Sequence, residues 1–189
     1  MKIKLKEYER IHQIIKSIIL GECADPLVSC TFFAFYGAYV LKKHYKLKAE
    51  VKVGLAAYHV GVNCDAILFG EKIGDEVTSS ITGFHCWVEC DGWAIDFMAP
   101  LFSEIAKQRG ASSLPSPKMF QKPMEKMEGD LASLRGAGDF FYGYNTELLV
   151  NRFEYMSSRN AYSDLAEICS TWYKKRTKKD TRIYPNGRC

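Results

Sequence analysis

The sequence predicts an α+β fold in which two helices are followed by antiparallel strands and then by further helices. Three observations indicate it: a helical repeat of apolar residues at 3–20, strand-like runs between residues 50 and 98, and helical patterns again from residue 147. Because the strands follow one another without intervening helices, the order favours an antiparallel sheet over an alternating βαβ arrangement. With 189 residues, the chain is expected to form a single domain, residues 1–189.

The first two helices are predicted from different patterns. Residues 3–20 place apolar side chains at helical spacing with charges between them, which indicates an amphipathic helix. A second helix is expected to begin near Ser29, a good N-cap residue. From Cys30 to Leu41 this segment is apolar or aromatic all round. We therefore expect it to be the buried central helix of the domain.

The remaining elements follow from shorter patterns. Strands are expected at 50–62, 65–70, 83–98 and 139–144, and helices at 101–108, 147–157 and 160–175. The stretch 110–138 is rich in Ser, Pro and Gly and is interpreted as a long loop, a candidate lid over a site. The chain thus divides into a core at 25–100, the loop at 110–138 and a helical segment at 147–175.

Composition argues against several classes of function. The net charge is only +4, and the basic run at 174–179 is typical of a solvated helix end, so no nucleic-acid partner is expected. The N-terminus lacks the apolar core of a signal peptide, and the apolar stretch 14–20 is too short to span a bilayer, so no membrane partner is expected. Seven cysteines without an export signal indicate free thiols in the cytoplasm.

The stretch from Gly83 to Asp96 carries the clearest signal of a site. Its Asp91-Gly92 pair predicts a two-residue type I′ turn between two short strands. Pairing across that turn places Cys86, Val88, Cys90, Trp93, Ile95 and Phe97 on one apolar face, and His85, Trp87, Glu89, Ala94, Asp96 and Met98 on the other. His85 and Asp96 are then diagonal neighbours, roughly 7–8 Å apart at the backbone. The carboxylate can therefore orient the imidazole, and Glu89 is the competing orienter.

Cys30 is the candidate nucleophile because it heads the buried helix. A helix N-terminus lowers the pKa of a thiol and offers backbone N–H groups to an oxyanion. Cys64, in a turn, is the rival, whereas Cys86 and Cys90 lie on the hairpin face opposite His85. The sequence thus predicts a triad of Cys30, His85 and Asp96, which requires a turn of two residues.

Two other arrangements are open to the same residues. His59 lies on a predicted strand and is an alternative base, although no carboxylate pairs with it by register. Zinc binding by His85, Cys86 and Cys90 is disfavoured, because strand alternation places the imidazole opposite the thiols and the sequence has no Cys-x2-Cys pair. No metal or other cofactor is therefore expected.

The residues of this region resemble a known superfamily. The run Ser29-Cys-Thr-Phe-Phe-Ala-Phe35 resembles the nucleophile helix of papain-fold enzymes. The pattern His85-x-Trp-x-Glu, with Gly-Trp and Asp96 after it, resembles the His and Asp strands of transglutaminase-like proteins. Arylamine N-acetyltransferases use a similar order of Cys, His and Asp. The resemblance covers about residues 25–100 and implies an uncharacterised branch of the papain-like cysteine-proteinase superfamily, with a buried nucleophile helix against an antiparallel sheet.

Two departures from these families limit what the resemblance implies. Papain relatives carry a Gln before the Cys as an oxyanion donor, and the run 21–26 contains none. The oxyanion hole then rests on the Cys30 backbone N–H and a second donor that the sequence does not identify. The acetyltransferases' surroundings of the Cys are also missing, so coenzyme A is not implied.

These observations predict a thiol-dependent acyl-transfer enzyme, most simply an amide or peptide hydrolase. Cys30 attacks a carbonyl carbon, His85 protonates the leaving group and Asp96 fixes its tautomer. Water as acceptor gives hydrolysis of an amide- or peptide-containing substrate, whereas an amine gives a transglutaminase-like acyltransferase. The alternative is an inactive binding or assembly protein that retains the fold.

Overall fold

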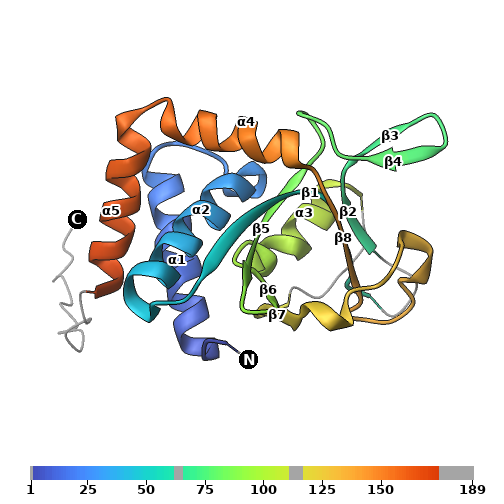
Figure 1. Cartoon of the computed structure of the whole chain (residues 1–189), viewed down its shortest axis with the longest axis horizontal. Helices are drawn as coiled ribbons and strands as arrows, with labels where there is room; N and C mark the ends of the chain where they lie inside the picture. The colour runs from blue at the N-terminus through green and yellow to red at the C-terminus, as the bar shows by residue number, and fades with distance from the viewer. Residues whose placement is uncertain (1, 62–65, 111–116, 175–189) are drawn as a thin grey trace, which may run out of the picture.

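Most of the helices gather on one side of the molecule, and a curled antiparallel sheet lies on the other (Figure 1). This computed structural model describes residues 2–61, 66–110 and 117–174. The helices are α1 (Leu5–Gly21), α2 (Cys30–Val40), α3 (Phe102–Gln108), α4 (Thr146–Ser157) and α5 (Asn160–Lys174). The strands are β1 (Ala49–His59), β2 (Ala66–Phe69), β3 (Glu71–Ile73), β4 (Glu76–Thr78), β5 (His85–Cys90), β6 (Trp93–Asp96), β7 (Phe120–Pro123) and β8 (Phe140–Tyr144). The predicted α+β order is confirmed.

Helix α2 lies at the centre of the helical side, as its composition predicts. It contacts α1, α5 and strand β5. Its start at Cys30 matches the predicted boundary, but the Ser29 hydroxyl donates to the carbonyl oxygen of Asp25 at 2.7 Å and does not cap the helix. At Gly37 a Cβ atom would lie 2.2 Å from the ring of Phe97. Only glycine therefore allows α2 to lie this close to the chain that follows β6.

The other face of α2 is covered by the C-terminal helices. Its half-buried side chains Phe32 and Phe35 contact Tyr162 of α5 and Phe153 of α4 edge to face, with ring centroids 5.2 and 4.9 Å apart. Helices α4 and α5 agree with the predicted segments 147–157 and 160–175, apart from residue 175, which lies outside the described residues. No helix in the described ranges is both long and apolar enough to cross a bilayer.

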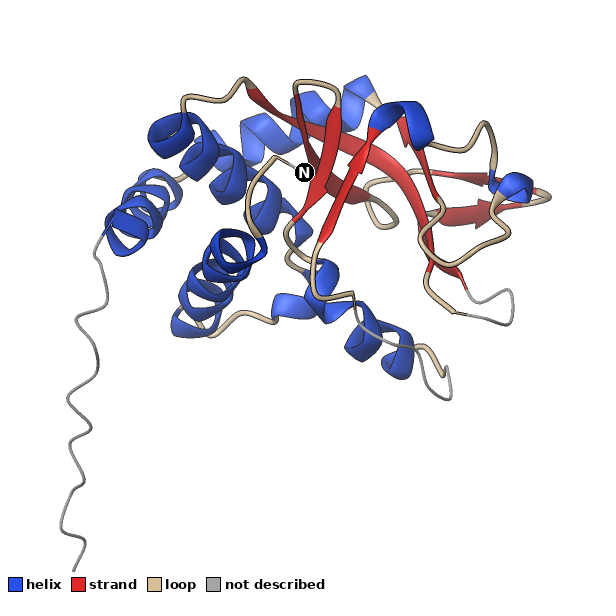
Figure 2. Ribbon diagram, turned by 90° about the horizontal axis from the view of Figure 1, so that it is seen from below, coloured by secondary structure: helices blue, strands red, loops and turns tan. Residues whose placement is uncertain are grey.

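The main sheet has the order β2-β1-β5-β6-β7, and β8 also pairs with β1. Figure 2 shows the strands of the structure in red beside the helices in blue. Strand β1 is the long central strand: its first half pairs with β5, and its second half pairs with β2 and β8. The change of partner occurs at Gly54, which aligns with both His85 and Tyr144. This arrangement brings aromatic side chains of β1, β2 and β8 to the end of β5 that carries His85.

The hairpin of β5 and β6 has the predicted turn and register. Asp91 and Gly92 have φ angles of 46° and 77°, the positive values that a type I′ turn requires. Val88 aligns with Ile95, and Glu89 with Ala94. Both faces of the hairpin are buried, however, because β1 and β8 bring aromatic rings over the face that carries His85.

The prediction that residues 110–138 form a loop was wrong in part. Phe120–Pro123 forms β7, which pairs with β6 and extends the sheet, and residues 111–116 lie outside the described part of the chain. The cause is Phe120, whose ring packs edge to face on Tyr58 and Phe140. Burial of this one aromatic ring therefore outweighs a local composition that favours a loop. The short hairpin of β3 and β4 was not predicted either.

Candidate active site

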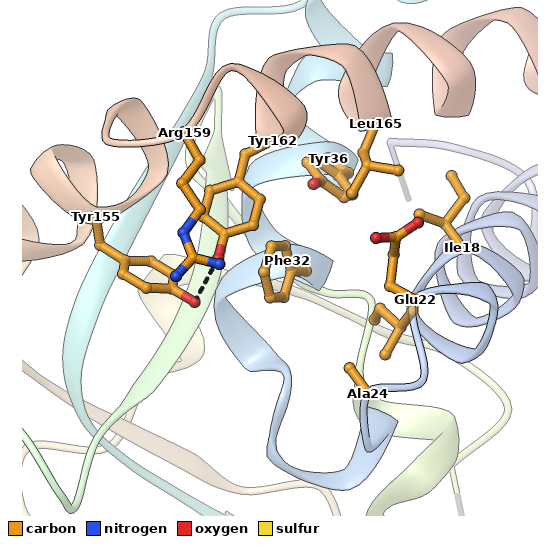
Figure 3. A pocket seen from close by; sticks show the side chains of 10 residues that line it. Ile18, Glu22, Ala24, Phe32, Tyr36, Tyr155, Arg159, Tyr162 and Leu165 are labelled. Atoms are coloured by element: carbon orange, nitrogen blue, oxygen red, sulfur yellow. Dashed lines mark hydrogen bonds between the residues drawn. The ribbon is translucent and has the colours of Figure 1, made fainter.

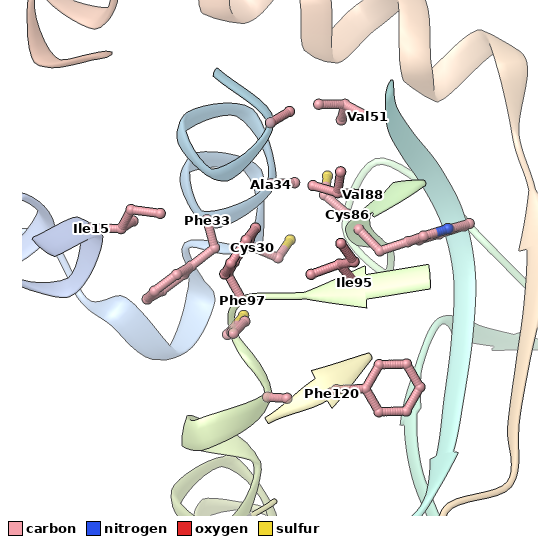
Figure 4. Close-up of a cluster of buried hydrophobic side chains, with 14 of the residues drawn as sticks. Ile15, Cys30, Phe33, Ala34, Val51, Cys86, Val88, Ile95, Phe97 and Phe120 are labelled. Atoms are coloured by element: carbon pink, nitrogen blue, oxygen red, sulfur yellow. The ribbon is translucent and has the colours of Figure 1, made fainter. Parts of the chain in front are cut away.

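Cys30 lies where α2 meets the sheet. It is the first residue of the helix and is 7% exposed. Figure 4 shows its side chain directed from α2 toward the strands, among the core side chains Ile95 and Phe97. Backbone N–H groups in the first turn of a helix have no partners within the helix, so this position suits a thiolate or an oxyanion.

His85 and Asp96 meet across the hairpin, as the register predicts. The imidazole Nε2 atom lies 2.7 Å from Asp96 Oδ2, and the two residues are 0% and 1% exposed. The other ring nitrogen, Nδ1, has no hydrogen-bond partner among the described residues. Glu89 does not compete as orienter, because its Oε1 atom accepts hydrogen bonds from Trp87 Nε1 at 3.1 Å and from the Tyr144 hydroxyl at 2.5 Å.

The Asp96 carboxylate is held by donors that hairpin geometry alone does not reveal. The Tyr58 hydroxyl of β1 donates to Oδ2 at 2.6 Å, and the backbone N–H of Met98 donates to Oδ1 at 2.9 Å. The Tyr142 hydroxyl of β8 lies 3.0 Å from that of Tyr58. Both carboxylate oxygens therefore have partners, as a buried charge requires.

The surroundings favour a charged pair of thiolate and imidazolium. Burial lowers the pKa of His85, but the charge and hydrogen bond of Asp96, together with Cys30, outweigh burial and raise this pKa to about 9. The pKa of Cys30 is held well below its usual range, first by a hydrogen bond from Cys86 and then by His85, both acting against burial. Each charged group of the pair thus stabilises the other.

Cys86 is a neighbour of Cys30 that the sequence reasoning did not identify. It projects from β5 on the face opposite His85, as predicted, yet Figure 4 shows it beside Cys30. Its thiol lies 3.7 Å from the Thr31 hydroxyl, and burial, with its hydrogen bond to Cys30, raises its pKa. His85 and Cys86 are the first two residues of β5 and project from opposite faces of the strand. Both nevertheless lower the pKa of the Cys30 thiol.

Aromatic rings cover the imidazole. Phe69 of β2 stacks on His85 with centroids 4.2 Å apart, and Tyr58 meets the same ring edge to face at 5.8 Å. The guanidinium of Arg109 lies over the ring of Phe69, 5.0 Å from its centroid. These residues belong to segments remote in sequence and carry no local motif, so only the sheet topology brings them together.

The competing site residues fall elsewhere. His59 of β1 is 3% exposed, and its ring nitrogens have no hydrogen-bond partner among the described residues. It lines a cavity of about 290 Å³ that Cys30, His85 and Asp96 do not line. Cys64 lies outside the described residues. His12 of α1 is buried and bonds to the carbonyl oxygen of Phe97 at 2.7 Å. In the described part of the chain, no three His, Cys, Asp or Glu side chains converge as metal ligands would.

Comparison with known proteins gives a family and one solved relative. Residues 4–184 match the family described as "Protein of unknown function (DUF2026)". A solved structure described as "The crystal structure of genomics APC5867" is 40% identical, with a TM-score of 0.83 over 95% of this chain and 84% of that one. No curated protein matches the sequence. The chain therefore belongs to the DUF2026 family.

Proposed function

We propose that this protein is a thiol-dependent amide or peptide hydrolase with Cys30 as nucleophile, His85 as base and acid, and Asp96 as orienter. One observation carries the proposal: a buried His85–Asp96 pair, 2.7 Å apart, whose imidazole helps to lower the pKa of the Cys30 thiol at the start of a helix. Because perturbed thiols and imidazoles cluster at functional sites, this combination favours catalysis over a purely structural role.

The proposed reaction has two stages. The Cys30 thiolate attacks the carbonyl carbon, and N–H groups at the start of α2 hold the resulting oxyanion. The His85 imidazolium then protonates the departing amine, which leaves a thioester on Cys30. Water, deprotonated by His85, attacks the thioester carbonyl, releases the acid and restores the thiol. An amine in place of water would give acyl transfer.

The fold supports the same proposal by analogy. A nucleophile on a buried helix, with His and Asp on adjacent antiparallel strands, resembles the papain-like arrangement, and the chain order Cys30, His85, Asp96 agrees with it. The mechanism requires a reduced thiol. The five cysteines of the described residues are free, which suits a cytoplasmic protein.

One observation favours a second candidate, a binding or assembly protein that has kept the fold without catalysis. His85 is 0% exposed with Phe69 stacked on its ring, and Cys30 is 7% exposed, so both reacting groups are buried in this structure. If the protein is an enzyme, binding of a substrate should displace the Phe69 side chain from His85. If it is a non-catalytic binding protein, Phe69 should stay in place.

An activated ester tests the proposal without knowledge of the natural substrate. Mixing the protein with p-nitrophenyl acetate should release nitrophenol in a burst equal to the protein concentration, and mass spectrometry of acid-quenched protein should find the acetyl group on Cys30. Cys30→Ser should abolish the burst, whereas the matched variant Cys90→Ser should keep it. A slow release without a burst, or acetyl groups distributed over other residues, would contradict the proposal.

A further inference from the structure

A second cavity lies between α1, α2 and the region where α4 meets α5. It has a volume of about 220 Å³, and neither Cys30, His85 nor Asp96 lines it. Figure 3 shows aromatic rings on its walls: Phe32 and Tyr36 from α2, Tyr155 from α4 and Tyr162 from α5. The Tyr155 and Tyr162 hydroxyls are joined at 2.8 Å, so this wall is fixed by packing and a hydrogen bond.

Tyr36 gives the cavity a polar group that the protein itself does not use. Its side chain is 1% exposed and lines the cavity, and its hydroxyl has no hydrogen-bond partner among the described residues. A buried hydroxyl without a partner destabilises the folded state. Phenylalanine would fill the same space without that cost, so a hydroxyl at this position indicates a ligand with an acceptor group.

Two opposite charges stand at the rim of the same cavity. Glu22 follows the last turn of α1, and Arg159 precedes α5. Both are exposed, and neither takes part in an ion pair within the described residues. The Arg159 guanidinium lies 5.8 Å from the ring centroid of Tyr162, and Figure 3 shows it on the side of the cavity away from Glu22. The charges therefore do not neutralise each other.

We propose that this cavity binds a free α-amino acid with an apolar side chain. The ligand ammonium would pair with Glu22, its carboxylate with Arg159 and the Tyr36 hydroxyl, and its side chain would pack among Phe32, Ile18 and Leu165. Arg159 would repel a simple cation and Glu22 would repel a simple anion, so a zwitterion, which carries both charges, fits best. This inference goes beyond the proposed hydrolase and does not depend on it.

Isothermal titration calorimetry of the full chain with L-leucine and with L-phenylalanine tests the inference. Binding is expected for both. N-acetyl-L-leucine and L-leucinamide should each bind at least about 10-fold more weakly than L-leucine, because each lacks one charge-assisted contact. Glu22→Gln and Arg159→Gln should each weaken L-leucine binding by a similar factor. Glu154→Gln, at an exposed position of α4 that does not line the cavity, should leave it unchanged.

Tyr36→Phe separates binding from folding. Because the hydroxyl has no partner among the described residues, its removal should keep or raise the melting temperature while L-leucine binding weakens. The same titration on Cys30→Ser should give unchanged binding, so a failed hydrolase proposal leaves this result standing. Absence of binding at about 10 mM ligand, far above the Kd expected for two charge-assisted contacts, would overturn the inference. So would acetylated and amidated forms that bind as tightly as L-leucine, or L-leucine binding that none of the three cavity variants weakens.

Discussion

The Tyr58 hydroxyl and the His85 imidazole meet on one oxygen atom. Both approach Asp96 Oδ2, at 2.6 and 2.7 Å, from strands β1 and β5. The Tyr58 ring also meets the His85 ring edge to face at 5.8 Å. Tyr58 therefore fixes the carboxylate and restricts the imidazole from the side, which makes it a positioning residue for the proposed triad.

Tyr58→Phe should weaken both stability and reactivity. The buried carboxylate loses one donor, so we expect the free energy of unfolding to fall by about 1–3 kcal/mol. The acetylation burst should slow, because the imidazole loses part of its orientation. Chemical denaturation and stopped-flow kinetics measure the two effects. Tyr144→Phe is the matched control, since that half-exposed hydroxyl donates to Glu89 away from the triad, and its stability should change by less than about 0.5 kcal/mol. Equal effects of the two variants would remove the special role of Tyr58.

Cys86→Ala should make Cys30 less reactive at low pH. The Cys86 thiol is the largest influence that lowers the pKa of Cys30, so without it this pKa should rise. Iodoacetamide labelling of Cys30 at pH 6 should therefore be slower than in the unmodified protein. Cys90→Ala is a close control, because Cys90 lies on the same strand face and its thiol contacts Asp91 instead. Faster labelling of Cys30 in Cys86→Ala would show that the neighbouring thiol acts in another way.

Asp96→Asn should lower the pKa of His85. In the protein this pKa is raised from the ordinary 6.5 to about 9, so the imidazolium persists up to that pH, and the carboxylate is the main raising influence. The associated stabilisation is complete below pH 6.5 and is lost as the pH rises through about 9. An NMR titration of the imidazole measures the pKa directly, and the stability gap between the two proteins should narrow at high pH. An unchanged His85 titration in Asp96→Asn would refute the assigned pairing.

Gly37→Ala should destabilise the packing of α2 on the chain that follows β6. The added Cβ would lie 2.2 Å from the Phe97 ring, so the ring must move, and overpacking of this kind costs about 1–3 kcal/mol. Gly21→Ala provides the control, because no atom would lie within 4 Å of the added methyl group and alanine favours a helix. Thermal unfolding of both variants checks the difference. A Gly37→Ala protein as stable as the parent would mean that Phe97 is loosely packed.

The sequence was sufficient for those parts of the site that depend on local geometry. The Asp91-Gly92 turn determines the register of β5 and β6, and the register determines that His85 and Asp96 meet. The start of α2 at Cys30 followed from an apolar segment preceded by a polar residue. In each case a few adjacent residues are sufficient to predict the local structure.

The parts that could not be predicted depend on pairing between distant strands. Tyr58 reaches Asp96 only because β1 lies beside β5, and Phe69 covers His85 only because β2 pairs with the far half of β1. The strand at Phe120 was missed for the same reason, since its stabilising contacts are rings from β1 and β8. Side-chain alternation gives the face of each strand but not its neighbour in the sheet.

The pH dependence of Cys30 alkylation tests the central claim most directly. Iodoacetamide labelling followed by peptide mapping gives the rate at Cys30 and, in the same sample, at the exposed thiol Cys23 as a reference. We expect Cys30 to reach its full rate well below about pH 8.5, the usual pKa of a thiol, and His85→Ala to move that rise to higher pH. A Cys30 rate that rises only above the usual thiol pKa and does not respond to His85→Ala would contradict the thiolate–imidazolium pair.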